Sequence, residues 1–134
     1  MSAGNLTQYL GIPYLNQGRT RQGLDCWGLI LLAYKELQGI DLYDPGIDYP
    51  VDWAMRGADH LIENHAHDWM RVYRPRPFDI AAFKNLAGIV NHVGIVTDVR
   101  SFIHCPKAGV VVCRLGDRPW SDRLSGFYRN RRLP

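Results

Sequence analysis

The chain has 134 residues, 46% of them hydrophobic, and a formal net charge of +3 at pH 7. This length predicts one domain, covering residues 1–134, with a hydrophobic core of its own. The weak positive charge does not favour a nucleic-acid partner, and we expect the arginines near the end of the chain to form a solvated surface. Those arginines are Arg114, Arg118, Arg123, Arg129, Arg131 and Arg132.

The sequence carries no recognisable export or membrane segment. Its first residues lack the basic start and the apolar stretch of a secretory signal. No apolar run approaches the roughly 20 residues that a membrane-spanning helix needs. We therefore expect a protein that is made in the cytoplasm and has no membrane span. Three cysteines without paired spacing also argue against a disulfide framework.

The first third of the chain predicts one main helix. The first ten residues predict a short helix, and the stretch 12–23 predicts an extended piece followed by a polar loop. Apolar residues then recur at helical spacing from Cys26 to about Gln38, which predicts the main helix. Asp25 is the expected N-cap of this helix, and Gly39 is its expected stop.

The rest of the chain predicts a second helix and then a sheet. A loop is expected over 41–51 and the second helix over 52–64. Runs of β-forming residues, broken once by prolines, predict short strands. These strands are expected at 69–73, 79–84, 89–97, 101–105, 110–114 and 127–129. Helices first and strands afterwards indicate an α+β fold, in which the N-terminal helices pack on a mostly antiparallel sheet of about five or six strands.

Two histidines, twelve residues apart, lie on neighbouring predicted strands. If a three-residue loop joins these strands, Thr97 pairs with Ser101 and Gly94 pairs with His104. His92 then lies diagonally from His104 on the same face, at a Cα separation of about 7–8 Å, and Gly94 leaves room beside the His104 ring. A two-residue loop is expected to place the two rings on opposite faces.

A thiol at a helix start, near two imidazoles, is the layout of a cysteine hydrolase. The helix start and a neighbouring imidazolium both favour a reactive thiolate at Cys26. His92 is the expected general base, and His104 is the group expected to orient the His92 ring. The backbone amide of Cys26 and the hydroxyl of Tyr14 are expected to stabilise the oxyanion.

The other two cysteines are expected to pack in the core. The same register places Cys105 on the opposite face from the histidines, together with Val93, Ile95 and Ile103. Cys113 is expected to pack in the same way. The thiol at the helix start is therefore the predicted nucleophile.

Several segments together resemble the NlpC family of papain-like cysteine peptidases, and the resemblance covers nearly the whole chain. Gly23–Leu29, with its Asp-Cys-Trp-Gly core, resembles the nucleophile motif of that family. The segments 92–96 and 102–104 resemble its two histidine strands. The segment 12–14 resembles its tyrosine segment, and 76–83 resembles its Pro-Gly-Asp strand.

The resemblance implies a papain-like α+β fold and hydrolysis of peptidoglycan stem peptides, commonly at the bond between D-γ-glutamate and a diamino acid. It implies Cys26 as nucleophile, His92 as base and His104 as the polar third member. It also implies that Tyr14 assists the oxyanion site and that Asp25 meets the amine of the substrate. No cofactor is expected.

Two residues depart from the family pattern. Trp27 stands where many members have serine, so we expect it to line a bulkier substrate pocket that lacks a serine contact. Phe78 stands where glycine is usual, and we expect it to alter the turn before its strand. The Asp-Cys-Trp-Gly form, the missing signal and the segment 120–129 resemble phage tail-assembly members. This implies an enzyme carried at a virion tail, with tail-tip proteins as possible partners.

Other functions stay open on the sequence alone. A tail or assembly protein that keeps the fold with weak or no activity has the same motifs, and an acyltransferase uses the same three groups. A zinc site is less favoured, because zinc prefers paired ligands at short spacing and a fourth ligand. Its candidate ligands are His60, His65 and His67, or the three proposed catalytic residues.

Overall fold

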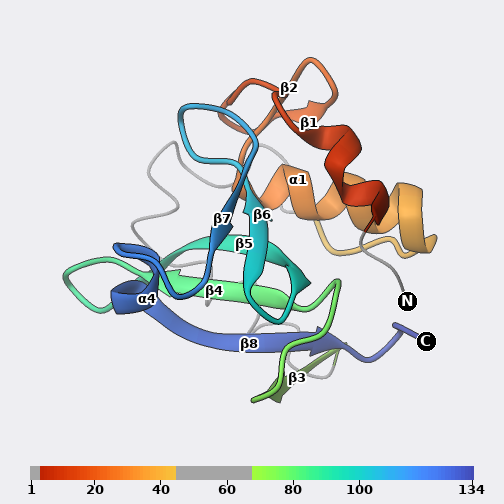
Figure 1. The fold of residues 1–134 in the computed structure, drawn as a ribbon. Helices are drawn as coiled ribbons and strands as arrows, with labels where there is room; N and C mark the ends of the chain where they lie inside the picture. Colours follow the sequence, from red (N-terminus) through yellow and green to blue (C-terminus); the bar gives the residue numbers. More distant parts are fainter. Residues whose placement is uncertain (1–3, 45–67) are drawn as a thin grey trace.

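The computed structural model describes residues 4–44 and 68–134, and within them the chain forms a six-stranded antiparallel sheet with the main helix on one face (Figure 1). The strand order is β3-β8-β4-β5-β6-β7. The predicted α+β class and antiparallel sheet are confirmed. The strands are β3 (Trp69–Val72), β4 (Ile80–Lys84), β5 (Val90–Asp98), β6 (Ser101–His104), β7 (Val111–Arg114) and β8 (Leu124–Asn130).

The main helix, α1 (Cys26–Ala33), begins where the sequence predicts, although its last turn is wider than expected. Asp25 is extended and caps the helix, because its Oδ1 accepts a hydrogen bond from the Gly28 amide at 2.7 Å. The helix continues as a π-helical turn, η2 (Tyr34–Gln38). It stops at Gly39, whose φ of 65° is the left-handed conformation typical of a helix C-terminus.

Short elements account for most of the differences from the prediction. The N-terminal helix is present in the 3₁₀ form, whereas a hairpin and a one-turn helix were not predicted. Strands of two residues are too short to show an alternating pattern, so the hairpin falls in a predicted loop. The predicted second helix, 52–64, lies outside the described residues. The elements are η1 (Gly4–Tyr9), β1 (Arg19–Thr20), β2 (Gly23–Leu24) and α4 (Trp120–Arg123).

Hydrophobic side chains pack on both faces of the sheet. On the first face, the buried side chains of α1 share one cluster with Val93 and Ile95 of β5. A smaller cluster on the second face contains Phe83, Val96 and Phe102. Because successive strand residues point to opposite faces, neighbours on β5 serve different cores. None of the helices in the described residues is both long and apolar enough to cross a membrane.

The β5–β6 hairpin keeps the predicted register through a different turn. Gly94 pairs with His104 as predicted, but Asp98 rather than Thr97 lies opposite Ser101. Thr97 is the extra residue of a β-bulge, so a two-residue turn does not reverse the faces. A Cβ built on Gly94 would lie 3.0 Å from the Cβ of His104, so glycine provides the space that was predicted.

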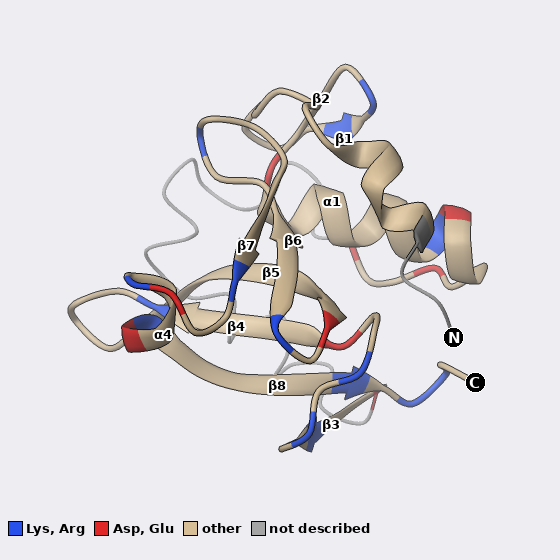
Figure 2. Cartoon of the chain, in the orientation of Figure 1, with Lys and Arg blue, Asp and Glu red and all other residues tan. Residues whose placement is uncertain are grey.

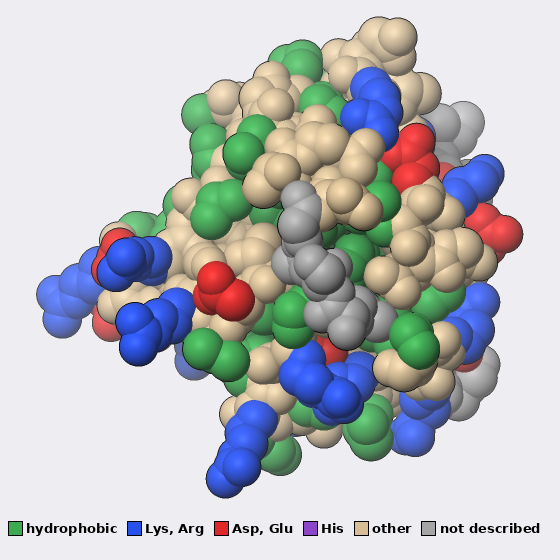
Figure 3. All heavy atoms as spheres, turned by 45° about the vertical axis from the view of Figure 1, so that its right-hand side comes forward, with side chains coloured by type: hydrophobic (Ala, Val, Ile, Leu, Met, Phe, Trp, Pro, Cys, Tyr) green, Lys and Arg blue, Asp and Glu red, His purple; other side chains and the backbone are tan. Residues whose placement is uncertain are grey.

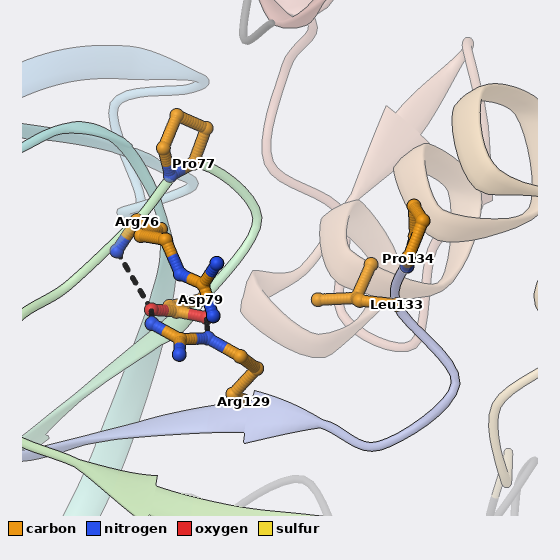
Figure 4. Close-up of a pocket in the computed structure, with 6 residues that line it drawn as sticks. All are labelled: Arg76, Pro77, Asp79, Arg129, Leu133 and Pro134. Carbon is orange, nitrogen blue, oxygen red and sulfur yellow. Dashed lines mark hydrogen bonds and ion pairs between the residues drawn. The ribbon is translucent and has the colours of Figure 1, made fainter. Parts of the chain in front are cut away.

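Basic residues gather at one end of the sheet, around β3 and the end of β8 (Figure 2). There Arg129 pairs with the buried Asp79 through Nε–Oδ1 at 2.8 Å and Nη2–Oδ2 at 2.7 Å. Figure 4 shows this pair in the wall of a cavity of about 120 Å³, which Leu133 and Pro134 also line. On the face in Figure 3, basic side chains form separate groups with other surface between them.

Phe78 occupies a backbone conformation that favours glycine. Its φ is 75°, which costs a non-glycine residue about 1–2 kcal/mol. The expectation that phenylalanine alters this turn gains no support from the backbone bonds, because the Phe78 amide donates to the Val96 carbonyl at 3.0 Å. The ring is 1% exposed, packs edge-on against Tyr34, and lies beside a hydrogen bond from the Tyr34 hydroxyl to the Phe78 carbonyl. The buried ring offsets the strain.

Replacing Phe78 with glycine should therefore lower the stability although it relieves the backbone. The lost burial of a phenylalanine is worth about 3–5 kcal/mol, and the relieved strain returns about 1–2 kcal/mol. We expect Phe78→Gly to lower the free energy of unfolding by about 1–4 kcal/mol, measured by urea denaturation. Gln17→Gly is the matched control at φ 60°, where no core ring is lost and the relieved strain should raise the stability by about 1–2 kcal/mol. A stabilised Phe78→Gly variant would contradict this account.

Candidate active site

The thiol of Cys26 lies against β5, close to the point where β6 ends. Pairing with β6 reaches only the Gly94–His104 pair, so the residues before Gly94 extend beyond β6. The Val93 amide acts on the thiol as a hydrogen-bond donor that lowers its pKa, so the sulfur lies on the side of the residue that follows His92. Cys26 is 6% exposed. The fold thus brings the predicted nucleophile to the strand that carries the predicted base.

Asp25 and Gly28 fix the start of α1 against the β1–β2 hairpin. Asp25 is 1% exposed, and it accepts hydrogen bonds from the Arg19 guanidinium and the Gln17 amide, each at 3.0 Å. A Cβ built on Gly28 would lie 2.0 Å from the Gly18 carbonyl oxygen, so only glycine allows this approach. These contacts hold the carboxylate inside the protein, and the expected contact of Asp25 with a substrate amine stays a prediction.

His92 and His104 form a hydrogen-bonded pair, as the register leads one to expect. Nε2 of His92 lies 2.7 Å from Nδ1 of His104. Phe83 packs beside the His92 ring with 6.1 Å between centroids, and Phe102 packs beside the His104 ring at 4.6 Å. His104 is fully buried. The pair therefore lies in apolar surroundings, on the face of the sheet opposite to α1.

Burial keeps the thiol and both imidazoles neutral at rest. It raises the pKa of Cys26 to about 12, and it lowers the pKa of His92 to about 3 and that of His104 to about 4. The Asp25 charge adds to the shift at Cys26. The expected resting thiolate is therefore not favoured, because desolvation outweighs the effect of the helix start. Nucleophilic attack from this state requires a base that takes the proton as the sulfur reacts.

Tyr14 lies on the segment that pairs with the residues just before the helix start. It forms an isolated parallel bridge with Leu24, just before the helix start, and its side chain is half-buried. Burial raises the pKa of its hydroxyl, and the nearby Asp25, Cys26 and Cys105 add to the shift. The hydroxyl therefore stays protonated and keeps its hydrogen-bond donor. Its part in catalysis stays a prediction.

Trp27 lies inside the protein. Its side chain is 2% exposed, and its indole N–H donates to the Tyr43 carbonyl at 3.1 Å. This bond ties the segment after α1 back to the helix. The structure gives no support to the expectation that the Trp27 ring lines a substrate pocket, because a buried indole does not reach a ligand.

The two remaining cysteines differ from each other. Cys105 is buried in the core cluster of α1, where its thiol donates to the Leu24 carbonyl at 3.1 Å, so its predicted packing role agrees with the structure. Cys113 is half-buried, and its Sγ lies 3.3 Å from Nε2 of His104. Sequence reasoning missed this contact. One signal for it was present, since Cys113 falls on the predicted strand that follows the His104 strand.

Sequence reasoning also missed the cover over the histidine pair. The ring of Trp120, at the start of α4, lies 4.6 Å from that of His104 and 5.5 Å from that of His92, measured between centroids. Arg123 lies over the outer side of Trp120 at 5.2 Å and donates to the Lys84 carbonyl. α4 therefore shields the pair from water on the second face of the sheet.

The alternative of a metal site gains no support from the part of the chain that the structure describes. Within residues 4–44 and 68–134, no group of three or more His, Cys, Asp or Glu side chains is arranged to hold a metal ion. This includes the three proposed catalytic residues. The other candidate ligands, His60, His65 and His67, lie outside the described residues.

Comparison with known sequences links the whole motif set to one family. The sequence model of the NlpC/P60 family matches residues 11–129. The tail tip assembly protein K of Escherichia phage N15 is 26% identical over 96 residues, which are 69% of this chain and 39% of that protein. The chain therefore spans well under half the length of this curated relative.

Solved structures with low sequence identity share the fold. An NlpC/P60 family protein from Bacillus cereus ATCC 10987 is 24% identical, with a TM-score of 0.68 over 100% of this chain and 41% of its own. NlpC2 from Trichomonas vaginalis is 21% identical, with a TM-score of 0.71 over 98% and 45%. The NlpC/p60 domain of the peptidoglycan hydrolase SagA is 21% identical, with a TM-score of 0.60 over 93% and 92%.

The neutral histidine pair predicts a loss of stability in mild acid. Unfolded histidines bind protons near pH 6.5, whereas the folded ones bind them only near pH 3 to 4. The unfolded state therefore binds more protons between these values, and the free energy of unfolding falls as the pH falls from 6.5 to 4. Each histidine contributes at most about 1.4 kcal/mol per pH unit.

Urea unfolding at several pH values between 7 and 4 measures this slope. His104→Asn keeps a polar side chain but removes one titrating group, so we expect a shallower fall in stability than in the wild type. Val112→Ala, an exposed change on β7, is the control and should keep the wild-type slope. Equal slopes for His104→Asn and the wild type would show that the pair is not held neutral.

Proposed function

We propose that this chain, which belongs to the NlpC/P60 family, is a cysteine endopeptidase that hydrolyses amide bonds in peptidoglycan stem peptides. The observation that carries the proposal is the arrangement around β5. The Val93 amide lowers the pKa of the Cys26 thiol, and the residue before Val93, His92, is held by His104 at 2.7 Å. Nucleophile, base and orienting group are thus supplied by α1, β5 and β6.

The proposed mechanism starts from a neutral thiol. As the Cys26 sulfur attacks the substrate carbonyl, its proton passes to Nδ1 of His92, whose Nε2 is held by His104. The resulting imidazolium is stabilised by that hydrogen bond. The Cys26 amide and the Tyr14 hydroxyl donate to the oxyanion, and one such donor is typically worth about 2.7–4 kcal/mol of the barrier.

The second half of the reaction reverses the proton transfer. The tetrahedral intermediate collapses, the C–N bond breaks, and His92 gives its proton to the leaving amine. A water molecule then attacks the acyl-enzyme thioester while His92 takes its proton. Collapse of this second intermediate releases the carboxylic acid and the Cys26 thiol.

A more specific proposal names the peptidoglycan bond that is cut and the place where the enzyme is carried. We propose cleavage between D-γ-glutamate and a diamino acid. The similarity to a phage tail tip assembly protein supports an enzyme that is associated with a virion tail. Such a location brings the enzyme to the cell wall, and tail-tip proteins are then its further partners.

A second candidate function is a tail or assembly protein that keeps the fold without activity. It is favoured by the similarity to the tail tip assembly protein of phage N15. An acyltransferase is a third candidate, because an acyl-enzyme that is resolved by an amine instead of water needs the same three groups.

Hydrolysis of purified peptidoglycan fragments tests the proposal. Cys26→Ala should lower turnover at least about 10³-fold, and His92→Ala should do nearly the same, because the two act as one unit. His104→Ala should cost less, about 10- to 100-fold, because His104 orients the base without reacting. Product analysis by mass spectrometry identifies the bond that is cut.

The controls separate the three candidates. Val112→Ala, on the exposed side of β7, should keep wild-type turnover, and circular dichroism should show that each variant is folded. If the wild type and Cys26→Ala are equally inert while particles still assemble, the chain is an assembly protein. If product forms only when an amine acceptor is added, the chain is an acyltransferase.

A further inference from the structure

Cys113 extends the histidine pair to a line of three side chains. Its Sγ lies 3.3 Å from Nε2 of His104, whose Nδ1 meets Nε2 of His92 at 2.7 Å. Cys113 is paired with Phe102 across β6 and β7, so it faces the same side of the sheet as His104. The line therefore crosses the neighbouring strands β5, β6 and β7.

The direction of the hydrogen bonds along this line decides whether His92 is a base. A neutral imidazole has one N–H and one acceptor nitrogen, and an imidazolium has two N–H groups. Once His92 has accepted a proton, its Nε2–H donates to Nδ1 of His104. His104 then carries its own proton on Nε2, the nitrogen that faces Cys113. The sulfur of Cys113 must accept this hydrogen bond, because the opposite direction leaves His92 protonated on Nδ1.

A second neighbour favours the sulfur as an acceptor. The ring of Trp120 packs on His104 with 4.6 Å between centroids. Burial raises the pKa of the Cys113 thiol, and the Trp120 side chain acts against that shift as a hydrogen-bond donor. An indole N–H is only a donor, so a lone pair of the sulfur faces Trp120. The S–H group then points away from Trp120, and the sulfur is free to accept from His104 as well.

We propose that Cys113 is a positioning residue, which accepts a hydrogen bond from Nε2–H of His104 and thereby keeps Nδ1 of His92 unprotonated and ready to accept a proton. The proposal rests on the proposed cysteine-peptidase function. It differs from a packing role, because a packing cysteine is replaced by alanine at a cost in stability alone. A positioning residue affects the protonation of two rings on other strands.

Steady-state kinetics on peptidoglycan fragments test the functional part. We expect Cys113→Ala to lower kcat about 10-fold with less than about a two-fold change in KM, since the sulfur acts through His104 and His92. Cys113→Ser keeps an acceptor and should return kcat to within about three-fold of the wild type. Val112→Ala, the neighbouring exposed residue, is the control. Equal kcat values for Cys113→Ala and Val112→Ala would overturn the proposal.

The ring nitrogens are observed directly by ¹⁵N NMR, and this readout does not need activity. In the wild type and in Cys113→Ser, both histidines should be protonated on Nε2, and Cys113→Ala should show a mixture of tautomers. A wild type with His104 protonated on Nδ1 overturns the proposal, as does an unchanged tautomer in Cys113→Ala. If the wild type shows the expected tautomers but is as inert as Cys26→Ala, the peptidase function fails while the positioning contact stands.

Discussion

The register between β5 and β6 is the constraint on which the site depends. Pairing of Gly94 with His104 places both histidines on one face, and a shift by one residue would move one ring to the other side of the sheet. The bulge at Thr97 maintains this register despite the short turn. Asp98 secures the turn, because its Oδ1 accepts from the Arg100 amide at 2.8 Å and from the Ser101 amide at 3.0 Å.

The same register explains why the site is neutral at rest. His92 and His104 lie on the face of the sheet that carries the second core, where they contact aromatic rings and are covered by α4. Protonation of either imidazole is unfavourable in these surroundings. A neutral thiol is a weak nucleophile, and it reacts only when a base takes its proton in the same step. In the proposed mechanism the empty Nδ1 of His92 is the proton acceptor, so control of the His92 tautomer matters more than in a site with a preformed thiolate.

Local signals were sufficient to predict the helix start, its stop and most strands. Asp25 and Gly39 act on neighbouring backbone groups, so their effect is visible in the sequence. The turn after β5 was predicted with one residue too many. A three-residue loop and a two-residue turn with a bulge place the two histidines on the same face of the sheet, so the pattern does not distinguish them. The contacts of Cys113 and Trp120 with the histidines were missed, since they depend on how β7 and α4 pack, which no local pattern encodes.

The two departures from the family pattern are core substitutions, and this bears on whether activity is retained. Phe78 adopts the positive φ that favours glycine, and its ring packs beside Tyr34 within the core cluster of α1. Trp27 follows the nucleophile in sequence, yet its indole points inward and bonds to the Tyr43 carbonyl. Both rings pack in the core cluster of α1, on the other side of the sheet from the histidine pair, so neither displaces Cys26, His92 or His104. The two substitutions therefore repack the interior and leave the residues of the proposed mechanism in place.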